Sequence, residues 1–417
     1  MNVLLFANIG TNVHGFYHVG DEAMFLEIYR FYKKRFPKIN ISALVNDKLH
    51  DQLDLNEVKL LPWPLNKRES RWYFFKLLLK TYYWKFFKHS IFNYEEQKLI
   101  KLVKKQDIIH YSGGGNINSE VGHWTYLSLM AASLANILDI PVILTSQTIG
   151  PFNLSDWILA LFVLRKAKIL TLREYTSKTQ KRLQRILRSV DINSSLDAAY
   201  FFDSTYKIIP KKANTLRIGL SLHVKANNQQ QIIDLIANTL NNLCGEYKTI
   251  EIVLLPHVLD RKQGWDMIIM SSLIKNLSKK ILVLNPDYHS LSKGKYEIAH
   301  IIKSYTKSCD LVISTRYHGL LFAISSAIPA IAVTDGEYQT MKSSEGLKFA
   351  FKQKYADHLV KLDSRDSVNN LLKTIGSTIT NAAAIHIELE KVNKLLRKQH
   401  EEYLDNLEEQ IRILQKA

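Results

Sequence analysis

Residues 310–333 read DLVISTRYHGLLFAISSAIPAIAV, and this stretch alone predicts the class of fold. Asp310–Ser314 is an apolar run of strand length, the residues through Ser326 continue at helical length, and a second apolar run follows Pro329. A strand, a helix and a further strand in succession make the βαβ unit of a parallel sheet. The stretch therefore predicts an α/β fold.

The same alternation extends through most of the chain. At 417 residues the chain exceeds the size at which one hydrophobic core usually keeps growing. Residues 206–214, with Pro210 and three lysines, have the composition of a linker. We predict two doubly wound Rossmann-like domains, 1–205 and 206–375, in the GT-B-like arrangement, and a long amphipathic helix over 376–417. The predicted strands are Val3–Ala7, Ile39–Val45, Asp107–Tyr111, Val142–Ser146, Lys168–Leu172, Arg217–Leu222, Thr249–Leu255, Ile281–Leu284, Asp310–Ser314 and Ala330–Val333.

Net charge and composition limit the possible binding partners and the expected cellular location of the protein. The net charge of +17 attracts phosphates, nucleic acid or anionic lipid headgroups, but no RRM, zinc-finger or basic-zipper signature is present, so no nucleic-acid partner is expected. Cys244 and Cys309 lie in ordinary apolar contexts, which favours core thiols over a disulfide or a metal site. Without a spanning apolar run or a secretory signal, the expected location is the cytoplasm.

Two segments lie outside the βα pattern, and each has two interpretations. Residues 63–95 form a basic-aromatic insertion, which either contacts an anionic membrane at the inner face of the cell membrane or packs as helices on its own domain. The helix over 376–417 has apolar residues near heptad spacing. It either packs back across the first domain, the interpretation we favour slightly, or forms a homo-oligomer.

Polar residues directly after predicted strands are the candidates for ligand binding, because ligands gather at the carboxyl ends of parallel strands. The run Arg316-Tyr317-His318 stands out, since Arg suits bidentate binding of carboxylate or phosphate and His exchanges a proton near neutral pH. The glycine run after Tyr111 offers backbone N–H groups to an anion, and residues 146–152 form a predicted polar loop. The other candidates are Gly113, Gly114, Gly115, Asn116, Ser146, Gln147, Arg173 and His257.

Taken together in this order, these motifs resemble the polysaccharide pyruvyl transferase family. The resemblance is carried by residues 20–23 (GDEA), 113–116 (GGGN), 146–152 (SQTIGPF), Arg173-Glu174 with Ser177, Pro256-His257, and 314–319 (STRYHG) continuing to Ile328-Pro329. It implies a GT-B-like fold, phosphoenolpyruvate as donor without any redox cofactor, and an acceptor sugar in a cell-surface glycan or its lipid-linked precursor. It also makes Arg316 and His318 the active-site signature. We expect Arg316 and Arg173 to hold the anions, His318 to transfer protons, and His257 to assist at the phosphate.

Two other functions stay open at this point. A glycosyltransferase or epimerase of the same fold would bind a nucleotide sugar and place a carboxylate on the ribose, for which Glu337 and Glu345 are candidates. A non-enzymatic relative would bind membrane glycolipid or a partner through the basic-aromatic segment and the last helix.

Overall fold

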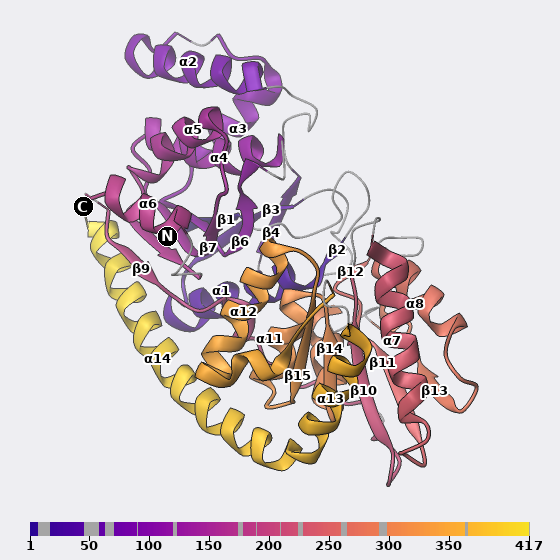
Figure 1. Ribbon diagram of the computed structural model, residues 1–417. Helices are drawn as coiled ribbons and strands as arrows, with labels where there is room; N and C mark the ends of the chain where they lie inside the picture. Colours follow the sequence, from indigo (N-terminus) through magenta and orange to yellow (C-terminus); the bar gives the residue numbers. More distant parts are fainter. Residues whose placement is uncertain are drawn as a thin grey trace.

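The structure is a computed structural model that describes all residues except 7–16, 46–57, 63–70, 90, 120–122, 174–177, 189, 209, 224–227, 260–264, 292–297, 363–365 and 417. Within these residues the chain forms two parallel β-sheets, each with helices on both faces (Figure 1). This confirms the predicted α/β fold with two doubly wound domains. None of the helices in the described ranges has the length and apolar character needed to cross a membrane.

The first sheet is built around the apolar strand β1, whose Val3, Leu4 and Leu5 are fully buried. A strand buried on both faces is expected in a parallel sheet covered by helices. Its register pairs Val3 with Ile41 on one side and with Ile108 on the other. The sheet order is β4 (Val58–Pro62), β3 (Asn40–Val45), β1 (Asn2–Phe6), β5 (Ile108–Tyr111), β7 (Val142–Ile149), β8 (Ile169–Leu172) and β9 (Ile192–Ser194), with β6 (Gly114–Ile117) on β7.

The second sheet repeats this plan. Counted within the sheet its strand order is 3-2-1-4-5-6, which is the Rossmann order, and the first sheet begins in the same way. The order is β13 (Ile281–Leu284), β11 (Ile250–Leu254), β10 (Leu216–Ser221), β14 (Leu311–Ser314), β15 (Ala330–Thr334) and β16 (Leu359–Lys361).

Two helices of the first domain, α3 and α5, begin at side-chain caps. Asn93 and Glu96 form a reciprocal capping box at the start of α3, and Asn153 caps α5 through the backbone N–H of Asp156. The helices are α1 (Val19–Arg35), α2 (Arg71–Phe87), α3 (Tyr94–Lys104), α4 (His123–Ile137), α5 (Leu154–Leu164) and α6 (Lys178–Ile186), and a short 3-10 helix covers Ala198–Tyr200. The second domain contains α7 (Gln229–Leu243), α8 (Trp265–Lys275), α9 (Tyr288–Leu291), α10 (Ile298–Lys307), α11 (Tyr317–Ser325), α12 (Glu337–Phe351) and α13 (Ser367–Thr380).

One of the hydrophobic core clusters spans the two domains. Phe25 and Ile28 of α1 belong to the same buried cluster as Ile302 of α10 and Phe322 of α11. The side chain of Glu22 crosses the boundary and accepts a hydrogen bond from the first turn of α10, at 2.9 Å from the nitrogen of Ala299. A two-stranded antiparallel sheet of β2 (Tyr17–His18) and β12 (Val258–Leu259) also joins the domains. The domains are therefore packed together rather than merely tethered.

The last helix, α14 (Ala382–Lys416), spans both domains (Figure 1). It begins beside the second domain, and its later residues reach the first, where Tyr403 contacts Thr171 and Arg35 pairs with Glu408. The structure confirms the predicted long C-terminal helix, but its predicted start at residue 376 is wrong. That position lies inside α13, and the two helices meet at Asn381. Of the two interpretations of this segment, the structure shows packing across the first domain.

Candidate active site

Arg316 and His318 lie at the junction of the two domains, at the carboxyl end of β14. Arg316 precedes α11 and His318 is in its first turn. Their side chains are 20% and 18% exposed, so both reach solvent while remaining partly enclosed. The strand order of the second sheet reverses between the neighbouring strands β10 and β14. In open α/β sheets, ligands bind outside the carboxyl ends of the strands at such a point.

A fully buried carboxylate, Asp266 of α8, holds Arg316. The Nε atom of Arg316 lies 3.2 Å from both carboxylate oxygens, and Nη2 also donates to Oδ1. The other oxygen of Asp266 accepts the backbone N–H groups of His257 and Val258 at 2.9 and 2.8 Å. Asp266 therefore orients Arg316 and also fixes the segment that pairs with the first domain through β12.

Burial alone would raise the pKa of Asp266. The positive charge of Arg316 and the hydrogen bonds from His223 and Arg316 outweigh this effect and hold the pKa well below its usual range. Asp266 is thus ionised at any physiological pH. Its charge keeps the guanidinium in one orientation.

A second buried carboxylate, Asp197, joins the two domains at His318. Arg173 of the first domain donates from Nη1 to Asp197, and both side chains are only 1% exposed. His318 of the second domain lies with Nε2 3.5 Å from the same carboxylate oxygen. Arg173 also donates from Nε to the hydroxyl of Thr148. One carboxylate therefore positions an arginine and a histidine that come from different sheets.

The pKa of Asp197 is lowered for the same kind of reason. Burial would raise the pKa, but Arg173, His318 and the backbone N–H of Ala199 stabilise the charged form and hold the pKa well below its usual range. An ionised carboxylate therefore lies beside His318 and orients its imidazole ring. This is the arrangement that a proton-transferring histidine requires.

Gly20 permits the close approach of the first domain to His318. A Cβ atom at Gly20 would lie 2.0 Å from Nδ1 of His318 and within 2.4 Å of two further ring atoms. Only a residue without a side chain fits there. The imidazole is therefore held between α1 on one side and Asp197 on the other.

The ring of Tyr317, the residue before His318, contacts two cationic side chains, those of Arg173 and Lys342. The guanidinium of Arg173 is 5.2 Å from the centre of its ring, and the ammonium of Lys342, from α12, is 5.0 Å from it. Such distances are within the range of cation–π contacts. Lys342 thus brings another positive charge near the site.

His257 is brought to the site but is almost completely buried. Burial, with a smaller contribution from the nearby His318, lowers the pKa of His257 to about 3, so the ring is neutral. Its ring packs edge-on against Phe322, and no described residue provides a hydrogen-bond partner for either ring nitrogen. His18 lies in the same region, and burial lowers its pKa too. A role of His257 at a phosphate stays a prediction, and it would act there as a neutral donor.

The glycine run leads directly into a short strand. Gly113 and Gly114 have positive φ angles of 114° and 124°, and β6 begins directly at Gly114. The run faces Arg173, because a Cβ atom on Gly115 would lie 3.3 Å from Nη2 of that arginine. Asn116 lies in β6 with Gly115.

The predicted polar loop beginning at Ser146 is wrong, because β7 continues to Ile149. Ser146 donates its hydroxyl to the backbone carbonyl of Leu196 at 2.9 Å. Gln147 donates its amide to the carbonyl of Thr145, also at 2.9 Å. Ser146 thus supports the segment that carries Asp197, and contact of either side chain with a donor stays a prediction. Glu174, Ser177 and residues 63–70 lie outside the described residues.

Sequence reasoning missed both buried carboxylates, and it missed Lys342. Asp197 follows β9, whose sequence Ile-Asn-Ser is too short and polar to stand out as a strand. A correct assignment of that strand would have put Asp197 at the carboxyl edge of the sheet. For Asp266, in the first turn of α8, no sequence pattern marks the role.

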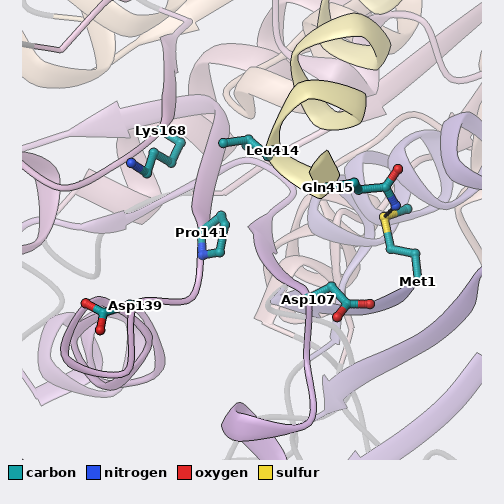
Figure 2. A pocket seen from close by; sticks show the side chains of 7 residues that line it. All are labelled: Met1, Asp107, Asp139, Pro141, Lys168, Leu414 and Gln415. Atoms are coloured by element: carbon teal, nitrogen blue, oxygen red, sulfur yellow. Dashed lines mark hydrogen bonds between the residues drawn. The ribbon is translucent and has the colours of Figure 1, made fainter. Parts of the chain in front are cut away.

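A cavity of about 500 Å³ lies at the opposite edge of the first sheet (Figure 2). Met1, Asp107 and Pro141 in its wall precede the strands, whereas ligands gather at the other end. Its carboxylates are already engaged: Asp107 accepts the backbone N–H of Asn2 at 2.7 Å, and Asp139 pairs with Lys85 at 2.5 Å. This cavity is therefore not the candidate active site.

Replacing Asp197 with Asn should lower the free energy of unfolding by about 3 kcal/mol at neutral pH, because Arg173 would stay buried without its countercharge. The folded pKa of Asp197 is below the unfolded value of about 3.9, so this stabilisation is present above that pH and is lost as the pH falls through the folded pKa. Urea unfolding of both proteins at falling pH should show the difference narrowing in acid.

The matched control is Asp405→Asn, which removes an exposed carboxylate 2.6 Å from Arg35. Because Asp405 is 61% exposed, we expect a change below about 1 kcal/mol. Equal destabilisation by the two substitutions at neutral pH would contradict a special role for the buried pair.

The fold and the site define a GT-B-type α/β protein with an arginine–histidine site at the junction of its domains. The chain belongs to the polysaccharide pyruvyl transferase family, whose model matches residues 18–337. This confirms the resemblance drawn from the motifs and identifies the protein as a transferase of that family. No curated protein matches the sequence.

Solved structures with the same fold have little sequence in common with this chain. Anabaena Alr3699/HepE in complex with UDP is 12% identical with a TM-score of 0.56, covering 97% of this chain and 100% of that one. The UDP-GlcNAc 2-epimerase of Neisseria meningitidis bound to UDP-GlcNAc is 12% identical with a TM-score of 0.55, covering 95% and 99%. Arabidopsis thaliana UGT89C1 complexed with quercetin is 11% identical with a TM-score of 0.53, covering 98% of both chains. These likenesses support the GT-B-like fold.

Proposed function

We propose that the protein transfers the enolpyruvyl group of phosphoenolpyruvate to a sugar and forms a pyruvate ketal. The observation that carries the proposal is the pairing of His318 with Asp197 beside Arg316, each held by a buried carboxylate at the junction of the domains. Membership of the polysaccharide pyruvyl transferase family supports the reaction class.

The donor has two anionic groups, and the site provides cations for them. Arg316 is the more exposed arginine, and its bonds to Asp266 use Nε and Nη2. A guanidinium has five N–H donors, so Arg316 can hold a carboxylate or phosphate while remaining anchored. Arg173 and Lys342 add positive charge around Tyr317.

Proton transfer falls to His318 in this proposal. The protonated imidazole donates its proton to the methylene carbon, while the oxygen of a first sugar hydroxyl bonds to the central carbon and gives its own proton back to the imidazole. The oxygen of a neighbouring hydroxyl then bonds to the same carbon, the bond from carbon to phosphate oxygen breaks, and phosphate leaves with the electron pair and the second proton. The sum is one phosphoenolpyruvate and one diol giving one ketal and one phosphate.

The acceptor in this proposal is a sugar of a cell-surface glycan or its lipid-linked precursor. The test is phosphate release from phosphoenolpyruvate by the purified protein with an array of such acceptors, together with the mass of the product. Release that depends on an acceptor, with a product heavier by one ketal-linked pyruvate, is the expected result. Release without acceptor, or none with any acceptor, would contradict the proposal.

A nucleotide-sugar transferase is the competing function, and the candidate carboxylates do not favour it. Glu345 is buried and pairs with Lys348 at 2.9 Å, which leaves the exposed Glu337 at the start of α12. Thermal shifts measured with phosphoenolpyruvate and with UDP-sugars separate the two functions. Stabilisation by UDP-sugars alone would move the assignment to a glycosyltransferase.

A further inference from the structure

Helix α2 has apolar residues on two opposite faces, and only one of them is covered. Phe74, Leu77 and Leu78 are buried against the first domain. On the other side Trp72 is 73%, Leu79 is 69% and Phe86 is 73% exposed. A helix that is apolar all round is normally buried all round, so the outer face calls for a partner.

The exposed residues form one continuous stripe. Trp72, Phe75, Leu79, Tyr83 and Phe86 follow each other at three- and four-residue steps, which places them on one side of a helix. Figure 1 shows α2 at the outer edge of the first domain, on the side away from the second sheet. We call these five residues the α2 stripe.

The charged side chains of α2 itself are all positive. From Ser70 to Tyr94 the sequence contains no Asp or Glu. Lys76 and Lys88 are exposed. Lys80 and Lys85 lie further toward the domain, where they pair with Glu96 and Asp139. A helix that carries aromatic rings and lysines, and no carboxylate of its own, is complementary to anionic headgroups over an apolar layer.

We propose that the α2 stripe docks α2 flat on an anionic lipid surface. Trp and Tyr rings then lie at headgroup depth, Leu79 and Phe86 enter the acyl boundary, and the lysines contact lipid phosphates. A second copy of this chain fits less well, because two such faces would bring only like charges together. The inference does not depend on the proposed reaction, since docking is measured without donor or acceptor.

The experiment is co-sedimentation of the full chain with vesicles of phosphatidylcholine, with and without phosphatidylglycerol. The wild type should bind the anionic vesicles, and binding should weaken with salt because the attraction between charges is screened. The double variant Trp72→Ser, Phe86→Ser should bind at least about tenfold more weakly, because it removes most of the inserted apolar surface. The double variant Lys76→Glu, Lys88→Glu should also bind more weakly to anionic vesicles.

The matched control is Ile387→Ser with Leu395→Ser on α14, where the side chains are 51% and 55% exposed and lie outside the α2 stripe. This variant should bind vesicles like the wild type. Three results would overturn the proposal: no binding of the wild type to anionic vesicles, equal loss in both serine variants, or a dimer in light scattering that only the Trp72 and Phe86 variant dissociates. The last result would assign the α2 stripe to a second copy instead.

Discussion

Replacing His318 with Gln should lower the rate of acceptor-dependent phosphate release by about 10²- to 10⁴-fold, the loss expected when a general acid is removed. Gln keeps a hydrogen-bonding group near Asp197 but cannot carry a proton to the methylene carbon. Binding of phosphoenolpyruvate should change little, since Arg316 and Asp266 are untouched. The measurements are steady-state phosphate release and the thermal shift induced by phosphoenolpyruvate.

His386→Gln is the control for this experiment. His386 is also paired with a carboxylate, at 3.3 Å from Glu390, but on the exposed surface of α14. Its replacement should leave the rate unchanged. If His318→Gln retained more than about a tenth of wild-type turnover, His318 would not be the proton donor.

Gly20→Ala should abolish activity nearly as completely, although it adds only a methyl group. The new Cβ atom would overlap three atoms of the His318 ring, so the imidazole must leave its place beside Asp197. Misplacing a catalytic group by about 1 Å can cost on the order of 10²-fold in rate. The folded state should survive, because alanine favours a helix over glycine by about 1 kcal/mol and so offsets part of the steric cost.

Gly376→Ala tests whether such a substitution is harmful in itself. Gly376 also lies in a helix, α13, but no atom lies within 4 Å of an added Cβ. We expect unchanged kcat and equal or slightly higher Tm. Full activity in Gly20→Ala, measured beside this control, would show that the contact between Gly20 and His318 is not needed.

The fold followed closely from the sequence because the central strands of both sheets are almost entirely apolar. All ten predicted strands exist, with ends shifted by a few residues. Six strands within the described residues were not predicted. Of these, β4, β9 and β16 are edge strands of their sheets, β2 and β12 form the small sheet that joins the domains, and β6 pairs with β7 outside the main strand order. Edge strands bury less surface and are short, so they lack the continuous apolar run that reveals a central strand.

Fewer of the candidate site residues could be predicted from the sequence. Arg316 and His318 were found because they sit in a recognisable run directly after a strand. Asp197 pairs with Arg173, 24 positions away in the sequence, and Asp266 pairs with Arg316, 50 positions away. Only the folded structure shows these pairs. Gly20 was noticed as part of a motif, but its contact with a ring nearly 300 residues later is a property of the domain packing.

The core shared by α1, α10 and α11 bears on how such proteins can diversify. One domain cannot simply be replaced by that of a relative. The packed faces of these helices, and the hydrogen bond from Ala299 to Glu22, require complementary residues on both sides of the junction. His318 is carried by one half and enclosed by Gly20 and Asp197 of the other. In a chimera of two relatives, each domain could therefore keep its fold, but the site around His318 would form only if the two domains were complementary at the junction.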